Sequence, residues 1–477
     1  MMGPVRSACH GSRAVVVLVA LGALVANSAC GARWSSAERA SVIARSQRTG
    51  AQVGAGAGDG STASAPPTLP GATGSGTTPG GAALVPGGGS TAGVSTGGAS
   101  SAGAAPGASP CAAPSTAPGV TSATLTVGSI STVSGPVPGL GETAVAAVRA
   151  YVAYRNATGG VCGRQIVLKT GDDGAENSRY RALVSDMASQ AVGLAGGLGA
   201  GDGGGVDVVN AQNLPVVATA VSDTFQNTPT VFDINPPFAN IHAVIGKYRY
   251  LSDHGVRTAA IVYLDNAQVR SQVEQQKAQM QAVGIRIVNE QALPLSTLSF
   301  DAAARAVANS KADYLFFPAN DSLDASMARS MADTGYKLKF GEYLTAYGSR
   351  FIDLAGPAAE GATDWARSLP REEAASNPEG SAFLEWMGRA APGLPADTFA
   401  ADSWASAKAF FDNLTALPGP ISRQALIAQL KSVGTYDAGG FIGPIQLGKK
   451  LSNGCYVAMQ VVSGKWKRLA PDRGFLC

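Results

Sequence analysis

Few residues of this chain have the types and the spacing that catalysis or metal binding requires. Neither His242 nor His254 lies in an HExxH context, so no zinc site is expected. Asp172 and Asp173 form a carboxylate pair after a predicted strand, where aspartate more often caps or forms a turn than catalyses. With no recognisable nucleophile–base motif either, we expect a protein that is not an enzyme and that holds no metal.

Three glycines spell a possible nucleotide-binding motif. Gly199, Gly201 and Gly204 form GxGxxG, and Asp223 follows at about the ~20-residue distance of a dinucleotide fingerprint. The motif follows the third predicted strand rather than the first, and a chain with 60 glycines matches it easily by chance. We therefore expect no cofactor. The net charge of +3, without any Lys/Arg cluster, also argues against nucleic acid.

Residues 1–30 are typical of an export signal. Two arginines precede an apolar run at 14–26, which fits the ~7–15 residues of a signal-peptide core and is too short to span a bilayer. Small residues then lead to Cys30, as in a bacterial lipobox, so we predict a lipoprotein-type signal with Cys30 lipidated. Asn27 stands where lipoboxes usually carry an aliphatic residue, and ordinary cleavage and release is the alternative.

Residues 31–119 are expected to form a disordered linker. Most of this segment is Gly, Ala, Ser, Thr and Pro, without an apolar period. Such a composition cannot bury enough surface to offset the entropy of the chain. Its Gly/Ser content makes it a flexible tether.

The cysteines beyond the linker's first part indicate disulfides. Cys111, Cys162, Cys455 and Cys477 are an even number in an exported chain, and no CxxC pair is present. Four cysteines permit three pairings. We favour Cys455 with Cys477, because they flank a predicted terminal hairpin, which leaves Cys111 for Cys162.

From residue 122 onward, predicted strands alternate with predicted helices. TLTVGSI and RQIVLKT are the first two strands, and NSRYRALVSDMASQ is one of the helices between strands. Two such runs, at about 123–243 and 257–350, predict two α/β lobes with parallel sheets. Near the end, CYVAMQVV and GKWKRLA predict a hairpin with Gly464 in its turn.

The order of several segments resembles the type I periplasmic binding proteins, in particular the leucine/isoleucine/valine-binding branch. VGSISTVSGPVPGLGE is similar to that family's first strand and Ser-Gly-Pro loop, RNATGGVCGRQIVL to the segment before its second strand, and GGFIGPIQL to a late crossover. The resemblance implies two doubly wound parallel-sheet lobes joined by a three-segment hinge, with the solute held between them.

The same resemblance implies the domain limits. The solute-binding domain is expected at 120–477. Its first lobe comprises about 120–244 plus 361–440, and its second lobe about 245–360 plus 441–477.

The expected ligand site lies in the loops that follow the strands. In open parallel sheets, ligands bind beyond the carboxyl ends of the strands, where helix N-termini offer N–H groups. In the second lobe, the positions where the family places aromatic residues and an acid for an amino acid ligand are different here, which puts a branched-chain amino acid in doubt. The expected ligand-binding residues are Ser134, Gly135, Gly197, Leu198, Gly199, Ala220, Ser222, Gln268, Asn320 and Tyr347.

The resemblance implies an extracytoplasmic solute-binding component of an ABC importer, with a permease and an ATPase as partners. The expected ligand is a small polar solute, such as an amino acid, an amide or an organic acid. The protein is expected on the outer face of the cell membrane, held by its lipid anchor, or else secreted. A ligand-sensing receptor on the same fold and, with less support, an exported enzyme are the alternatives.

Overall fold

The computed structural model describes residues 114–136, 139–235, 246–347, 350–452 and 454–477, and at residues 267 and 268 only the backbone. The predicted signal with Cys30, most of the predicted linker, and Cys111 lie outside the described residues. No helix in the described part is long and apolar enough to cross a membrane.

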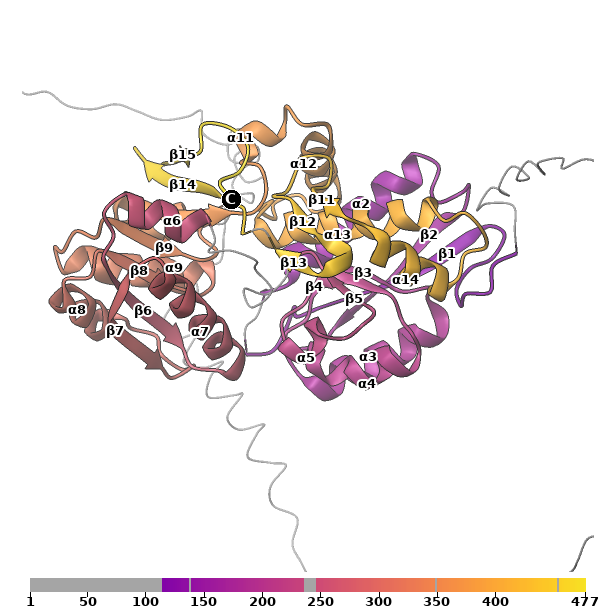
Figure 1. Cartoon of the computed structure of the whole chain (residues 1–477), viewed down its shortest axis with the longest axis horizontal. Coiled ribbons are helices and arrows are strands. Elements are labelled where there is room, and N and C mark those ends of the chain that lie inside the picture. Colours follow the sequence, from indigo (N-terminus) through magenta and orange to yellow (C-terminus); the bar gives the residue numbers. More distant parts are fainter. Residues whose placement is uncertain (1–113, 137–138, 236–245, 348–349, 453) are drawn as a thin grey trace, which may run out of the picture. The chain divides into compact units, whose positions relative to one another are not determined.

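The first lobe is built on a five-stranded sheet in which all neighbouring strands are parallel (Figure 1). Its strand order, β2-β1-β3-β4-β5, reverses direction between β1 and β3. In open α/β sheets, a ligand crevice forms at the carboxyl ends of the strands at such a reversal. The strands are β1 (Thr124–Ser131), β2 (Gln165–Asp172), β3 (Leu194–Leu198), β4 (Val216–Thr219) and β5 (Val231–Asp233).

Both faces of this sheet are covered, because successive strand residues point to opposite sides. In β4, Val217 packs into one apolar core while Val216 and Ala218 pack into another. The first core includes residues of α2 (Glu142–Ala157), α12 (Pro378–Ala390), α13 (Thr398–Thr415) and α14 (Arg423–Ser432). The second includes residues of α3 (Asn177–Gln190), α4 (Val206–Ala211) and α5 (Asp223–Gln226).

The second lobe repeats this arrangement and adds a hairpin. Five parallel strands have the order β7-β6-β8-β9-β10, which again reverses, here between β6 and β8. Antiparallel β14 and β15 extend the sheet beyond β10, which confirms the predicted terminal hairpin. The strands are β6 (Thr258–Leu264), β7 (Arg286–Leu293), β8 (Tyr314–Phe317), β9 (Phe340–Tyr343), β10 (Ala362–Ala366), β14 (Val457–Val462) and β15 (Lys465–Ala470).

Two apolar cores lie on the two faces of this second sheet. One includes residues of α8 (Asp301–Ser310), α9 (Asp321–Asp333), α10 (Phe351–Ala355) and the short η3 (Gly356–Ala359). The other includes residues of α6 (Gly246–Asp253) and α7 (Ala267–Ala282). The doubly wound α/β architecture expected from the sequence is therefore present in both lobes.

The lobe boundaries differ from the expected ones in two places. Residues 361–366 were expected in the first lobe, but β10 pairs with β9 and β14 in the second-lobe sheet. Residues 441–452 were expected in the second lobe, but Phe441, Ile445 and Leu447 pack into a first-lobe core. The local sequence pattern did not predict either boundary, because each boundary depends on which sheet or core the segment joins.

A small third sheet precedes the last segment that connects the two lobes. It is antiparallel, in the order β11-β12-β13, and it precedes the return to β14. Its elements are β11 (Thr435–Tyr436), β12 (Ile445–Gln446), η4 (Leu447–Lys449) and β13 (Leu451–Ser452). Three segments thus connect the lobes: after β5, after β10 and before β14.

One of the two expected disulfides falls within the described residues. Cys455 and Cys477 are joined by a disulfide, which confirms that pairing. The bridge closes the segment that contains the β14–β15 hairpin, and Tyr456 and Leu476 also exchange backbone hydrogen bonds there. The other expected pair, Cys111 with Cys162, includes a residue outside the described part and stays a prediction.

Candidate functional site

The loop after β1 is held by an aspartate that ends β2. Asp172 Oδ1 accepts hydrogen bonds from the backbone N–H groups of Val133, Ser134 and Gly174 at 2.9, 3.1 and 3.0 Å. Its Oδ2 accepts from the Ser134 hydroxyl at 2.5 Å. Partial burial acts to raise the pKa of Asp172, but these hydrogen bonds outweigh it and lower the pKa below its usual range. The Ser134 hydroxyl therefore has a partner within the protein.

Gly135 is required by the backbone of this loop. Its φ is +95°, and a Cβ added there would lie 2.2 Å from the Gly174 carbonyl oxygen. Only glycine fits such a conformation and such an approach. A ligand contact at Gly135 stays a prediction, whereas its role in the turn follows from the geometry.

The next aspartate holds the loop after β3. Asp173 is fully buried and accepts from the Thr132 hydroxyl at 2.6 Å and from Ala175 N at 3.1 Å. Its Oδ2 accepts from Gly201 N at 2.8 Å. The Asp172–Asp173 pair therefore closes two neighbouring loops at the β1/β3 reversal, consistent with the capping role that its sequence suggested.

The glycines around the end of β3 allow neighbouring segments of the chain to pack closely against it. Gly196 and Gly197 have φ of +71° and +100° and mark a break in the register between β3 and β4. The N–H groups of Gly197 and Leu198 donate to hydroxyls of Ser403 and Ser131, and Leu198 is buried.

The GxGxxG pattern has the same explanation. A Cβ on Gly201 or Gly204 would lie 2.6 or 2.0 Å from carbonyl oxygens at the start of α3. One on Gly199 would lie 2.6 Å from the Tyr180 ring. These glycines let the short η1 (Asp202–Gly205) approach α3 closely.

Asp202 holds the loop after β4, where Ala220 and Ser222 were expected to meet the ligand. Its carboxylate accepts from Val221 N at 2.6 Å and from Ser222 N at 3.0 Å. Burial raises the pKa of Asp202 to about 6, although the hydrogen bonds from this loop oppose the rise. The Ser222 hydroxyl caps α5 by accepting from Phe225 N at 3.3 Å, and Ala220 is buried.

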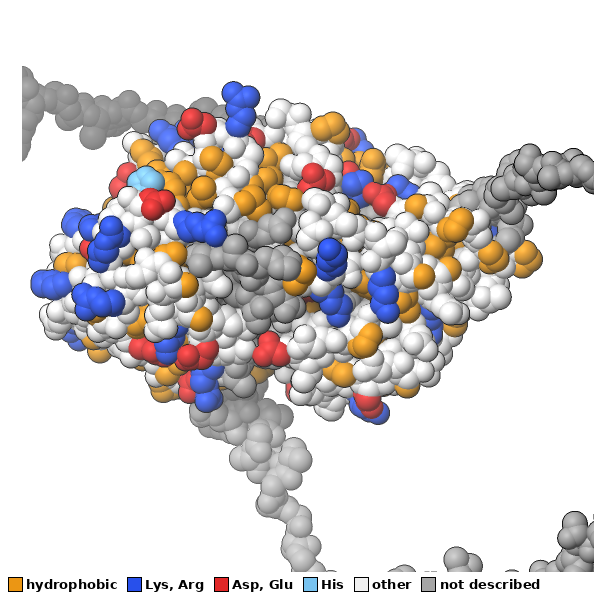
Figure 2. All heavy atoms as spheres, viewed as in Figure 1, with side chains coloured by type: hydrophobic (Ala, Val, Ile, Leu, Met, Phe, Trp, Pro, Cys, Tyr) orange, Lys and Arg blue, Asp and Glu red, His pale blue; other side chains and the backbone are white. Residues whose placement is uncertain are grey.

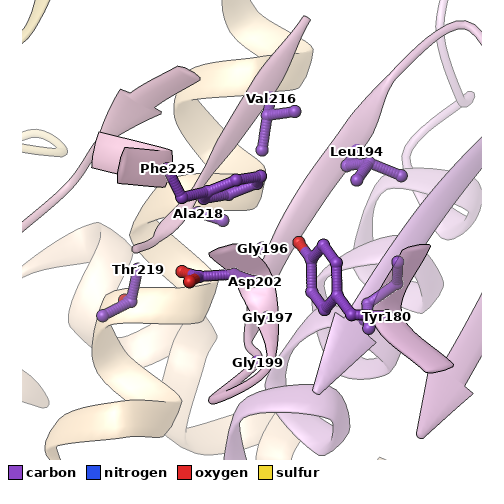
Figure 3. Close-up of a pocket in the computed structure, with 11 residues that line it drawn as sticks. Tyr180, Leu194, Gly196, Gly197, Gly199, Asp202, Val216, Ala218, Thr219 and Phe225 are labelled. Carbon is purple, nitrogen blue, oxygen red and sulfur yellow. The ribbon is translucent and has the colours of Figure 1, made fainter. Parts of the chain in front are cut away.

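A cavity of about 10 Å³ lies behind this loop. Tyr180, Asp202, Thr219 and Phe225 are among the residues that line it (Figure 3). It has room for about one water molecule. The cavity is therefore too small for an organic solute, and a ligand would have to bind outside it.

In the second lobe, two asparagines cap the helices that start at the carboxyl edge of the sheet. Asn266 accepts from Val269 N at 2.9 Å at the start of α7, and Asn320 accepts from Leu323 N at 3.1 Å at the start of α9. Asn320 thus lies at the expected edge but uses its side-chain oxygen as a cap. Gln268 lies in the first turn of α7, and its side chain is outside the described part.

Two acids that the sequence did not single out hold the loop around Tyr347. Asp324 of α9 accepts from Thr345 N at 3.1 Å, and Asp364 of β10 accepts from Tyr347 N at 2.7 Å. Tyr347 is buried, and its hydroxyl accepts from Arg371 N at 2.6 Å. The sequence has no acidic residue directly beside Tyr347. The carboxylates that hold this loop come instead from other elements, and no local sequence motif indicates them.

An ion pair and a small cavity occupy the place where the crossings meet. Arg367 follows β10 and pairs with Asp402 of α13, so it links the second-lobe sheet to a first-lobe helix. A cavity of about 20 Å³ is lined there by Arg367, Asp402, Asn235 and Tyr456, among others. These residues belong to all three crossings or their immediate neighbours.

Neither the face drawn in Figure 2 nor the described acidic, His and Cys side chains point to a nucleic-acid or metal site. On the face drawn in Figure 2, basic and acidic side chains are interspersed rather than gathered by sign. Among the described residues, no group of three His, Cys, Asp or Glu side chains is placed to hold a metal ion.

Two doubly wound lobes joined by three crossings are the architecture of a bilobal binding protein. A family model described as "Periplasmic binding protein" matches residues 124–465, and the chain belongs to that family. This confirms the resemblance that the sequence suggested. A search of the curated proteins finds no match.

Solved structures share the fold at low sequence identity. A fatty acid ABC transporter substrate-binding protein from Thermomonospora curvata is 18% identical with a TM-score of 0.64, covering 74% of this chain and 93% of that one. A putative branched-chain amino acid ABC transporter from Rhodospirillum rubrum is 18% identical with a TM-score of 0.57, covering 72% and 100%. A leucine-binding protein from Thermotoga maritima is 15% identical with a TM-score of 0.58, covering 73% and 98%.

Proposed function

We propose that this chain captures a small polar solute between its two lobes and delivers it to an ABC importer. One contact carries the proposal. The Ser271 hydroxyl, in the first turns of α7, donates to Asp223 Oδ2, at the start of α5, at 3.0 Å. The two helices follow β6 and β4, so the contact joins the carboxyl edges of sheets in different lobes. Ligands bind at these edges in open α/β sheets.

The transport role is supported by membership of the binding-protein family and by the names of related structures. Two of the structures with this fold are titled as parts of ABC transporters. We propose a permease and an ATPase as the partners, and an extracytoplasmic location reached through the predicted signal. Lipidation of Cys30 would hold the protein at the outer face of the membrane, with residues 31–119 as the spacer.

Binding is tested first by thermal unfolding of the protein against amino acids, amides, amines and organic acids. A true ligand at a hundredfold excess over Kd stabilises the folded state by about 2.7 kcal/mol and so raises Tm. The same ligand should reduce the radius of gyration in solution scattering, because it closes the lobes. Absence of any shift and of any contraction across the whole panel would contradict solute capture.

Delivery is tested separately. The identified solute, isotope-labelled, should enter cells that carry the partner permease and ATPase only when this protein is also present. A bound solute that closes the lobes without any dependent uptake would instead favour the sensing role.

A further inference from the structure

Residues 471–477, which follow β15, form a tail that packs where the segments connecting the lobes meet; its end is marked C in Figure 1. A disulfide joins Cys477 of the tail to Cys455 of the third connecting segment. The neighbouring residues Leu476 and Tyr456 exchange backbone hydrogen bonds at 2.7 and 2.8 Å. Cys455 and Tyr456 also line the small cavity at which the connecting segments meet. The tail is therefore fixed, covalently and by hydrogen bonds, to the third connection between the lobes.

The tail also contacts both lobes near the other two connections. A Cβ added to Gly246, the first described residue after the first connection, would lie 2.7 Å from the Leu476 carbonyl oxygen. Phe475 packs against the apolar cluster that contains Ala366, the last residue of β10 before the second connection. A Cβ added to Gly443, in a first-lobe segment, would lie 3.4 Å from the Phe475 ring. Residues in or next to each of the three connections therefore meet the tail.

An ion pair beside the tail joins the second-lobe hairpin to the first lobe. Arg468 of β15 donates from Nε and Nη2 to the two carboxylate oxygens of Glu373, each at 2.6 Å. Glu373 lies in α11 (Arg371–Ala374), whose last residue packs into a first-lobe core. The Arg468 side chain is only 12% exposed. A bidentate, charge-assisted pair has a fixed geometry, so it resists a change in the angle between the two elements that it joins.

The tail holds the Arg468 guanidinium in place for this pair. Its Nη1 donates to the Pro471 and Gly474 carbonyl oxygens at 2.8 and 3.0 Å. Both carbonyls lie between β15 and the disulfide-bonded Cys477, so the bridge fixes the turn that carries them. Because all three nitrogens of the guanidinium have acceptors, the side chain has little freedom to follow a displaced partner.

We propose that the tail, fastened by its disulfide, is a strap that restrains the angle between the two lobes. Hinge motion turns the lobes about their connecting segments, whereas Arg468 and Glu373 belong to different lobes, so a change of angle requires their bidentate pair to break. The angle held in this way is the one at which Ser271 of the second lobe reaches Asp223 of the first at 3.0 Å. For the proposed solute capture, a binding-competent geometry that is more populated before the solute arrives raises the apparent affinity.

The test measures the distribution of interlobe distances in the ligand-free, full-length protein. Spin labels are placed at Ser185 on α3 and at Asn309 on α8, which are exposed positions on different lobes. A ketone-bearing amino acid carries each label, so the cysteines are left untouched. Pulsed dipolar spectroscopy should give a distribution at least about 1.5-fold broader in Cys455→Ser with Cys477→Ser than in the wild type.

A second variant isolates the ion pair. Glu373→Ala removes both acceptors of Arg468 and leaves the disulfide intact, so it should also broaden the distribution, by at least about 1.3-fold. The matched control is Glu385→Ala, which breaks an exposed ion pair with Arg389 inside α12. Because that pair lies within one helix of the first lobe, its loss should leave the distribution unchanged.

Hydrogen exchange shows whether the change reaches the connections themselves. The Leu369 N–H group donates to the Phe441 carbonyl at 2.8 Å. The Gly443 N–H group donates to the Arg367 carbonyl at 2.7 Å, so both bonds tie the second connection to the first lobe. Val307→Ala, in the buried second-lobe core, lowers the stability of the whole fold and is the control. In the cysteine variant these two amides should exchange at least about tenfold faster than in this control.

Three outcomes overturn the proposal. One is a wild-type distance distribution in the cysteine variant, with faster exchange only at Tyr456 and Leu476, because the tail would then support the hairpin alone. Another is an equal broadening in Val307→Ala, which would trace the effect to general stability. The third is a broader distribution in the cysteine variant but not in Glu373→Ala, which would remove the ion pair from the strap. Because no solute is added, each outcome is independent of whether the chain captures one.

Discussion

Lys247 Nζ lies 2.9 Å from Glu342 Oε1, and each side chain is only 2% exposed. The pair joins α6, the first helix described in the second lobe, to β9 near the middle of its sheet. The Tyr314 hydroxyl also donates to Glu342, and the Lys247 ammonium lies 4.8 Å from the centre of the Tyr248 ring. A charge pair this deep is tolerable only because each member has these partners.

Removing one member of this pair should therefore be costly. Lys247→Met leaves the Glu342 carboxylate buried without a counter-charge and should lower the free energy of unfolding by about 3–5 kcal/mol. The double variant Lys247→Met with Glu342→Leu should recover much of that loss, since it buries no unpaired charge. Urea unfolding measures both. A single variant within about 1 kcal/mol of the wild type would contradict this account.

Stability should fall as pH rises from about 4 to 8. Burial raises the pKa of Asp364 to about 8, against about 3.9 for an unfolded aspartate. Between these values the folded state binds more protons than the unfolded state, so the free energy of unfolding decreases as pH rises through this window. Asp202 and Asp397, whose pKa values burial raises to about 6, act in the same direction between about pH 4 and 6.

The pH effect is checked by the dependence of Tm on pH. Asp364→Asn does not ionise and should flatten the profile between about pH 6 and 8. Asp186→Asn removes an exposed aspartate and should leave the profile parallel to that of the wild type. Below about pH 4 the trend should reverse, because the lowered pKa of Asp172 makes its protonation destabilising. A profile for Asp364→Asn parallel to the wild type would refute the assignment.

Loss of the Cys455–Cys477 disulfide should destabilise the protein. The bridge spans 22 residues, and its removal in Cys455→Ser with Cys477→Ser should cost about 3 kcal/mol by the chain-entropy model. Thermal unfolding measures the loss. If Cys111 and Cys162 are also bridged, a reductant should destabilise this double variant further. Non-reducing peptide mapping identifies the disulfide pairs directly. A peptide joining Cys111 to Cys455 would contradict both pairings.

Gly197 should not tolerate even alanine. Its φ is +100° and an added Cβ would lie 2.4 Å from the Ile130 carbonyl oxygen, so Gly197→Ala should cost at least about 1–3 kcal/mol. The matched control is Gly388→Ala in the exposed part of α12, where an added Cβ meets nothing within 4 Å. That change should stabilise the helix by up to about 1 kcal/mol. Equal Tm shifts for the two variants would be inconsistent with a backbone at Gly197 that only glycine fits.

Lipidation is tested at Cys30. If the thiol carries a diacylglycerol, the protein should incorporate labelled fatty acid and partition into detergent, since each buried CH₂ contributes ~0.8 kcal/mol. Cys30→Ser should release it into the aqueous phase without label. A serine variant that still carries label would reject the lipobox interpretation.

The repeated strand–helix pattern could be predicted from the sequence because it depends on local periodicity. The period-2 run TLTVGSI became β1, and the helix predicted at NSRYRALVSDMASQ became α3, with nearly the expected bounds. The terminal hairpin and its disulfide followed from spacing along the chain. The candidate loops were also placed correctly at the carboxyl ends of strands, since that edge follows from chain direction alone.

By itself, then, the sequence determined the two lobes, the family and the position of the candidate loops at the carboxyl ends of the strands. Only the tertiary structure decided the chemistry of those loops. Asp172 and Val133 are 39 residues apart, and Asp364 and Tyr347 are 17 apart, yet each carboxylate accepts the other residue's N–H group. Such pairs form because the sheets bring distant strand ends together, and a buried N–H group must find an acceptor. Neither the hydrophobic period nor any local motif predicts which acceptor a given N–H group finds.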